Sequence, residues 1–163
     1  MHIKTPNKPV SRRVLLFTLG GAELVALVSQ FSNALFGYFK PRIQPGSFGG
    51  KVVAGKPLEF KKGTVSHVQE GHFYVSRLAD GGYLALWQRC THLGCTVPWR
   101  KDLNQFVCPC HSSIFNPQGE VVGGPAPRAM DMFPIELTAG QLVVDTGNPI
   151  ARERFDPVQV FHT

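Results

Sequence analysis

Two motifs decide how this chain folds: Cys90-Thr91-His92-Leu93-Gly94-Cys95, and, further along, Cys108-Pro109-Cys110-His111-Ser112-Ser113. All four cysteines fall within these motifs, and each motif also carries a histidine. Clustered cysteines interleaved with histidines indicate metal ligation rather than disulfides spread across the fold. Cys90-x-His92 and Cys108-x-x-His111 suit a tetrahedral zinc ion, or a [2Fe-2S] cluster with thiolates on one iron and imidazoles on the other. The spacing alone leaves both open.

The other two cysteines lie beside the candidate ligands. Cys95 and Cys110 each stand a few residues from a ligand, one in each motif, so a disulfide between them would tie the two loops together. Structural disulfides persist in oxidising compartments, and such a bond would suit a site outside the cytoplasm.

The surrounding domain is predicted to be all-β. The 163 residues include 17 Gly and 13 Pro, a composition typical of many turns and short strands. We expect an antiparallel sandwich or small barrel with no long helix. Its strand-like runs are residues 51–54, 57–60, 64–68, 72–78, 83–88, 104–107, 120–122, 132–137 and 142–145.

The N-terminus has the pattern of a membrane anchor. Residues 1–13 are basic and contain no acid, and residues 14–39 are mostly apolar and long enough to cross a bilayer. The positive-inside rule places the N-terminus in the cytoplasm and the domain on the extracytoplasmic side of a bacterial cell membrane. Ser11-Arg12-Arg13 is similar to a twin-arginine export signal. Glu23, inside the apolar segment, suggests packing against a protein partner in the membrane.

The chain divides into segments by composition. A Pro- and Gly-rich linker is expected at residues 40–50, and the β domain at residues 51–146, with its metal-binding part at about 88–128. Residues 147–163 carry no motif, and their length suggests an arm laid on the domain or on a partner. The net charge of +6 comes without a nucleic-acid motif, so we expect no nucleic-acid partner.

Both motifs resemble those of the Rieske iron-sulfur family. The resemblance implies one [2Fe-2S] cluster, with Cys90 and Cys108 on one iron and His92 and His111 on the other. It further implies a Cys95–Cys110 disulfide, a hydrogen bond from Ser113 to a bridging sulfide, and a proline-rich loop, Gly123-Gly124-Pro125-Ala126-Pro127-Arg128, that covers the cluster.

The chain departs from the family pattern at two positions. Ser112 stands where the family has glycine, and we expect it to be tolerated because serine adopts most turn geometries. Phe115 stands where high-potential members have a tyrosine that donates to a ligand sulfur. Without that donor the reduced cluster is less stabilised, which favours a lower potential and menaquinol rather than ubiquinol as donor.

The resemblance implies a subunit of a quinol-cytochrome c reductase. In that role His111 hydrogen-bonds quinol and takes its proton, Leu93 and Pro125 belong to the docking face, and the partners are a cytochrome b-type subunit and a c-type cytochrome. An alternative is the electron-transfer subunit of another extracytoplasmic oxidoreductase, such as arsenite oxidase. Ferredoxins of ring-hydroxylating oxygenases fit less well, because they lack an anchor and the second cysteine pair. A zinc-stabilised binding module is the remaining alternative.

Overall fold

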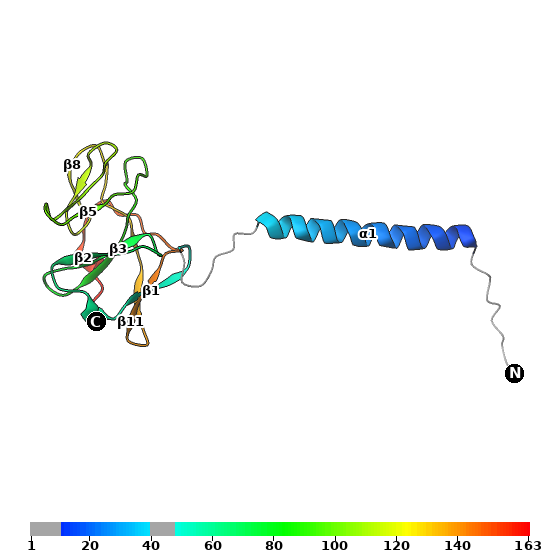
Figure 1. Ribbon diagram of the computed structural model, residues 1–163, viewed down its shortest axis with the longest axis horizontal. Helices are drawn as coiled ribbons and strands as arrows, with labels where there is room; N and C mark the ends of the chain where they lie inside the picture. The colour runs from blue at the N-terminus through cyan, green and yellow to red at the C-terminus, as the bar shows by residue number, and fades with distance from the viewer. Residues whose placement is uncertain (1–10, 40–47) are drawn as a thin grey trace. The chain divides into compact units, whose positions relative to one another are not determined.

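The computed structural model of this chain describes residues 11–39 and 48–163 (Figure 1). Most of the predicted basic segment at 1–13 and of the predicted linker at 40–50 lies outside the described residues. The chain divides into two compact units, a helical one and a β domain, and each is described by itself.

The helical unit is a single apolar helix. Helix α1 spans Arg12–Phe39, 28 residues, and none of its residues is buried. At helical rise it is about 42 Å long, more than the roughly 30 Å of a bilayer core. Its mean hydropathy reaches 1.8, and within the described residues it is the one helix long and apolar enough to cross a membrane. The predicted helix is therefore confirmed, beginning two residues earlier so that Arg12 and Arg13 lie in its first turn.

The second unit is built from short antiparallel strands joined by turns, and the all-β prediction is confirmed. Its elements are β1 (Lys51–Gly55), a single-turn helix η1 (Pro57–Glu59), β2 (Thr64–Val68), β3 (Phe73–Arg77), β4 (Tyr83–Trp87), β5 (Trp99–Arg100), β6 (Gln105–Val107), β7 (Ile114–Phe115), β8 (Val121–Gly123), β9 (Met132–Phe133), β10 (Ile135–Thr138), β11 (Gln141–Asp145) and a second single-turn helix η2 (Pro157–Gln159).

These strands form three sheets, with orders β1-β11-β10, β2-β3-β4-β9 and β5-β6-β7-β8. In Figure 1, β5 and β8 lie at one end of the domain, β3 in the middle, and β1 and β11 toward the other end. The sheet containing β3 and β4 is therefore a central layer.

The sequence of β3 and β4 explains why their sheet is central. Successive side chains of a strand point to opposite faces. β4 is apolar at all five positions, and β3 is apolar at its first three, with Ser76 buried after them. Tyr83 and Ala85 pack into a core shared with β1 and β11, whereas Leu84 and Leu86 pack into a second core that contains Cys90 and Cys108. Both faces of this sheet are buried, and one of them supports the metal-binding end of the domain.

Two strand predictions were wrong in detail. The run predicted at 57–60 is helix η1, because Pro57 is suited to a first helical position and the Glu59 carboxylate accepts the Lys56 backbone N–H at 2.9 Å. The strand predicted at 132–137 is divided into β9 and β10 at Pro134, which cannot donate to a ladder. Strands β5 and β7 have two residues each, too few for a pattern in the sequence to reveal.

Residues 147–163 lie on the β domain as an arm. The Ile150 and Met132 backbones pair, and Tyr83 and Phe161 exchange two N–H···O=C bonds of 2.8 and 3.0 Å. A Cβ added at Gly82 would lie 2.1 Å from a Val160 methyl carbon, so the arm packs closely against the start of β4. The arm thus runs from β9, beside the metal-binding end, back to β4.

Candidate metal centre

Two loops with the same backbone conformation form the site. The first, residues 90–95, follows β4, and the second, residues 108–113, follows β6. Gly94 N–H donates to Cys90 C=O at 2.9 Å, and Ser112 N–H donates to Cys108 C=O at 3.0 Å. Each loop is closed by a second bond of 2.8 Å, from Cys90 N–H to Cys95 C=O and from Cys108 N–H to the carbonyl of Ser113. The matching closures give the two candidate cysteine ligands equivalent positions at the base of the loops.

Comparison of the two loops shows that the backbone of Ser112 is in an unfavourable conformation. Gly94 has φ +82° and its counterpart Ser112 has φ +55°, both in the left-handed region. This region costs a residue with a Cβ roughly 1–2 kcal/mol relative to glycine. Serine is accommodated at this position, as predicted, but in a strained conformation.

Replacing Ser112 by glycine is therefore expected to raise the free energy of unfolding by about 1 kcal/mol. The side chain is exposed, so its removal takes no buried contact away. Urea denaturation of the detergent-solubilised full chain measures the change. A neutral or destabilising result would show that the serine is not strained.

The disulfide predicted by resemblance is confirmed, since Cys95 and Cys110 are bonded. It joins the end of the first loop to the middle of the second. The Cys108 Sγ lies within 4.8 Å of both disulfide sulfurs. Because disulfide sulfurs are not thiolates, Cys108 is the one member of this trio able to bind a metal.

The four predicted ligands differ in burial. The Cys90 and Cys108 thiols are free and only 3% and 2% exposed, while His92 is half-buried and His111 exposed. The two imidazoles meet edge to face, with ring centroids 4.9 Å apart. The thiols therefore belong to the apolar core and the imidazoles lie at the surface, one of each from either loop.

Ser113 provides a test of whether an iron-sulfur cluster fits this site. Its hydroxyl Oγ is fully buried and has no hydrogen-bond partner among the described residues. An unsatisfied buried hydroxyl is costly, and native proteins seldom retain one without reason. A sulfide of a bound cluster would accept this hydrogen bond and so account for the unpaired hydroxyl. The residues present fit a [2Fe-2S] cluster.

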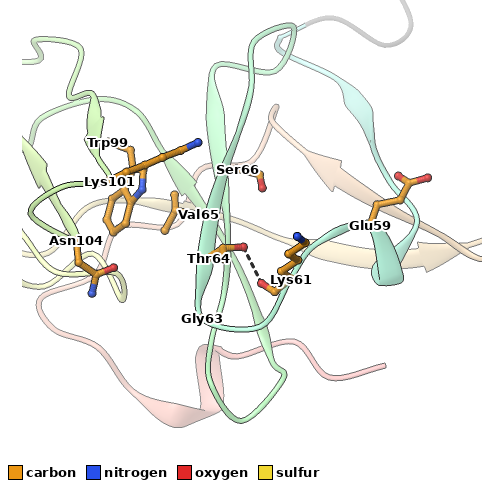
Figure 2. A pocket seen from close by; sticks show the side chains of 9 residues that line it. All are labelled: Glu59, Lys61, Gly63, Thr64, Val65, Ser66, Trp99, Lys101 and Asn104. Atoms are coloured by element: carbon orange, nitrogen blue, oxygen red, sulfur yellow. Dashed lines mark hydrogen bonds between the residues drawn. The ribbon is translucent and has the colours of Figure 1, made fainter.

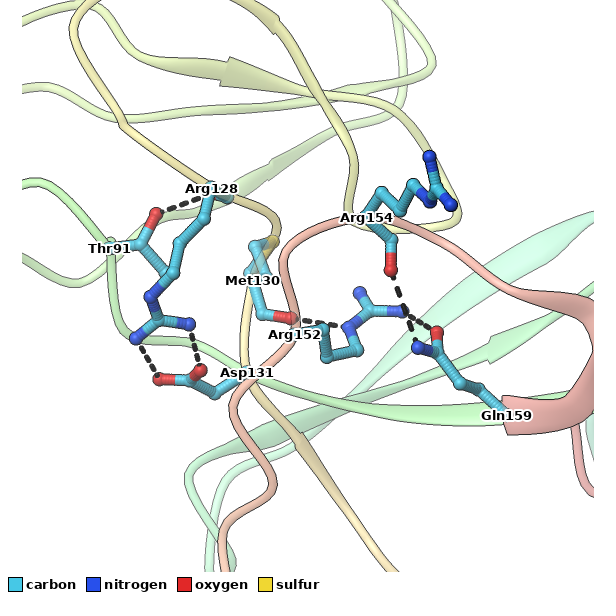
Figure 3. Close-up of polar contacts among 7 residues, drawn as sticks. All are labelled: Thr91, Arg128, Met130, Asp131, Arg152, Arg154 and Gln159. Carbon is cyan, nitrogen blue, oxygen red and sulfur yellow. Dashed lines mark hydrogen bonds and ion pairs between the residues drawn. The ribbon is translucent and has the colours of Figure 1, made fainter.

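The proline-rich loop packs directly on the second ligand loop. Gly124, at φ +82°, lies so close that a Cβ there would be 2.5 Å from the Ser112 carbonyl oxygen and 2.5 Å from the Ser113 Cα. On its other side the loop is tied to the first ligand loop, since Thr91 Oγ1 donates to Arg128 C=O at 2.7 Å (Figure 3). The proline-rich loop is therefore in contact with both ligand loops.

Two further contacts hold this region, and neither was predicted from the sequence. The Arg128 guanidinium pairs with the Asp131 carboxylate through two hydrogen bonds. Arg152 of the C-terminal arm is only 3% exposed and donates to the Met130 carbonyl at 2.7 Å and to the Gln118 carbonyl at 2.8 Å. Figure 3 shows the two arginines on either side of Met130. The arm thus contacts the backbone on both flanks of the proline-rich loop.

Burial lowers the pKa of Arg152 to about 10, and the nearby carboxylates of Asp131 and Glu120 oppose the shift. This pKa is still well above neutral pH, so the guanidinium remains charged in the protein. Its charge is compensated by carbonyl dipoles and by the Gln159 amide oxygen at 3.0 Å rather than by a direct ion pair.

Fold and site together fit the class of iron-sulfur electron-transfer proteins. Residues 50–134 match the family model of the Rieske [2Fe-2S] domain. The chain belongs to the Rieske family, whose domain binds a [2Fe-2S] cluster, and its function is electron transfer.

Relatives of known assignment extend this likeness over most of the chain. Iron-sulfur subunit 1 of the cytochrome b6-f complex of Synechocystis is 31% identical over 149 residues, covering 82% of this chain and 84% of that subunit. The cytochrome b6-f iron-sulfur subunit of Prochlorococcus marinus is 34% identical over 145 residues, covering 79% of this chain and 80% of that one. The solved structure of a naphthalene 1,2-dioxygenase, with TM-score 0.51, 19% identity and coverage of 62% of this chain and 27% of that chain, shares the fold.

Proposed function

We propose that this chain carries single electrons through a cluster held by Cys90 and Cys108 on one iron and by His92 and His111 on the other. The observation that carries the proposal is the pairing of two buried thiols with two surface imidazoles on disulfide-linked loops. Buried thiols hold one iron within apolar surroundings, and surface imidazoles present the other to a partner. The buried Ser113 hydroxyl would donate a hydrogen bond to a sulfide of the bound cluster.

The proposed donor is a quinol and the proposed acceptor a c-type cytochrome, within a membrane complex that includes a cytochrome b-type subunit. The cytochrome b6-f iron-sulfur subunits above support this role, because they align with most of the chain. When bound, the cluster supplies one-electron redox chemistry. The exposed His111 hydrogen-bonds the quinol and accepts its proton, and Leu93, 69% exposed, with Pro125 forms an apolar rim that excludes water from the contact.

The proposed placement is a single-pass protein of a bacterial cell membrane with its β domain on the extracytoplasmic side. The basic residues before the apolar segment support a cytoplasmic N-terminus, and the disulfide suits an oxidising compartment. We retain residues 1–13 as the cytoplasmic segment with its twin-arginine-like motif, 14–39 as the anchor, 40–50 as the linker, 51–146 as the cluster-binding domain and 147–163 as an extension.

Electron paramagnetic resonance of the dithionite-reduced full chain, combined with redox titration, tests the cluster. A histidine-ligated [2Fe-2S] signal with one midpoint potential is expected, and a colourless, zinc-loaded protein would end the proposal. Quinol-cytochrome c reductase activity of the purified membrane complex tests the partners. Purification with a molybdenum subunit and without cytochrome b would favour the arsenite oxidase alternative.

Replacing Phe115 by tyrosine is expected to raise the midpoint potential by about 40 mV. Phe115 is fully buried in the core that contains both ligand cysteines. A hydroxyl added there can donate to a ligand sulfur, and a net hydrogen bond of about 1 kcal/mol corresponds to roughly 40 mV for a one-electron couple. Phe155→Tyr, half-buried against the same core, is the control and should leave the potential unchanged. An unchanged potential in Phe115→Tyr would remove the argument for menaquinol as donor.

Replacing Ser113 by alanine is expected to lower the midpoint potential by about 50–100 mV. A hydrogen bond to a charged acceptor contributes roughly 1.5–3 kcal/mol, and the reduced cluster, being more negative, gains more from it. Redox titration followed by electron paramagnetic resonance measures the shift. Ser112→Gly retains the Ser113 hydroxyl and should keep the parent potential. If the potential of Ser113→Ala matched that of the parent, the hydroxyl would have no role at the cluster.

A further inference from the structure

A groove lies beside β2, away from the metal centre. Two adjoining cavities of about 440 and 340 Å³ have Val65, Ser66, Trp99 and Lys101 in common, so they form one continuous depression. Figure 2 shows Trp99 and Lys101 on one side of β2, and Ser66 and Lys61 on the other. None of the proposed cluster ligands lines it. A partner bound in the groove would leave the cluster accessible.

Strands at the ends of two sheets form the walls. Strand β2 is the end strand of the order β2-β3-β4-β9, and β5 is the end strand of the order β5-β6-β7-β8. Among residues 48–163, no other strand or isolated bridge pairs with the outer side of either. An end strand presents unpaired backbone N–H and C=O groups, to which an extended peptide can add as a further strand. Val65, 8% exposed, gives this edge an apolar floor.

The charged side chains that line the groove indicate which kind of segment binds there. Lys61 and Lys101 line it, and neither forms an ion pair with another described residue. Glu59 is the one acidic residue of the lining, and its carboxylate already accepts the backbone N–H of Lys56. Carboxylates of a bound chain would therefore meet two available cations, which gives specificity and speeds association.

The undescribed segments of this chain do not suit the groove. Residues 1–10 and 40–47 contain no aspartate or glutamate, and they carry Lys4, Lys8, Lys40 and Arg42. Their charge has the same sign as that of the groove, so electrostatics disfavours either segment as the occupant. The complementary segment must come from another polypeptide.

We propose that the groove binds an extended acidic segment of a partner polypeptide, which adds to β2 as a strand and places carboxylates beside Lys61 and Lys101. The proposal does not depend on the identity of the electron donor or acceptor. It supplies a second attachment point that holds a partner while the cluster end remains free to exchange electrons.

Site-specific photo-cross-linking in native membranes tests the proposal. The full chain carries p-benzoylphenylalanine in place of Ser66, which lines both cavities, or in place of Leu137, 48% exposed on β10, as the control. Mass spectrometry then identifies the cross-linked peptide. We expect position 66, and not position 137, to label a segment of a different polypeptide that contains several aspartates or glutamates.

A charge-reversed variant makes the test specific. Lys61→Glu combined with Lys101→Glu should reduce the yield at position 66 by about tenfold or more, and raising the salt concentration should also reduce it. Unchanged electron paramagnetic resonance and thermal unfolding of this variant show that fold and cluster remain intact. Labelling of lipid, of a second copy of this chain or of a segment without acids would overturn the proposal. The proposal would also be overturned if the cross-linking yield at position 66 were unchanged by charge reversal, or if it equalled the yield at position 137.

Discussion

Replacing Gly124 by alanine is expected to lower the free energy of unfolding by about 3–5 kcal/mol and to release the cluster during purification. The added Cβ would lie 2.5 Å from both the Ser112 carbonyl oxygen and the Ser113 Cα. Both are backbone atoms of the second ligand loop, so neither can rotate away as a side chain would. The clash is relieved only if the proline-rich loop and the ligand loop separate. Separation would expose the buried Ser113 hydroxyl and the cluster beside it to water.

Gly140→Ala is the matched control for this variant. Gly140 has φ +74°, close to the +82° of Gly124, but an added Cβ there meets no atom within 4 Å. The free energy of unfolding of Gly140→Ala should therefore fall only by the roughly 1–2 kcal/mol that a left-handed conformation costs alanine. Thermal unfolding of the detergent-solubilised full chain, followed by visible absorbance of the cluster, compares the two. Equal losses in both variants would show that backbone strain accounts for the effect and that the loop contact contributes nothing.

The parts of this protein that the sequence predicted are those in which chemistry constrains residue type and spacing locally. Metals accept few ligand types, and the Cys90-x-His92 and Cys108-x-x-His111 patterns therefore indicate a metal site without any knowledge of the fold. The apolar length of α1 is likewise a local property, fixed by the thickness of a bilayer. The strands β2, β3 and β4 were predicted within about a residue of their observed ends, because turn residues bound them on both sides.

The parts that the sequence did not predict depend on contacts between distant segments. The strain at Ser112 becomes visible only when its loop is compared with the loop around Gly94. The bond from Thr91 to the Arg128 carbonyl joins residues 37 positions apart, and threonine in a loop gives no sign of such a partner. Residues 147–163 carried no motif, and their backbone pairing with Met132 and Tyr83 is invisible in the sequence. A single buried arginine there, Arg152, is indistinguishable in sequence from the exposed Arg154.

Replacing Arg152 by alanine is expected to lower the free energy of unfolding by about 3–4 kcal/mol, a fall of about 15 °C in Tm. The guanidinium donates to the Met130 and Gln118 carbonyls and to the Gln159 side chain. Its loss removes these donors from buried acceptors and leaves a cavity where the side chain was. Because Gln118 precedes β8 and Met130 precedes β9, both ends of the segment that carries the proline-rich loop lose support. The cluster should therefore be lost at a lower temperature as well.

Two further variants separate the causes of this effect. Arg154→Ala is the control, since the Arg154 side chain is exposed and points away from Arg152 in Figure 3, and its stability should stay within about 0.5 kcal/mol of the parent. Arg152→Met restores most of the lost volume but none of the donors. If hydrogen bonding to the two carbonyls dominates, this variant should remain nearly as unstable as Arg152→Ala. Recovery of parental stability would instead show that Arg152 acts by filling space, and that the arm needs no polar bond to hold the proline-rich loop.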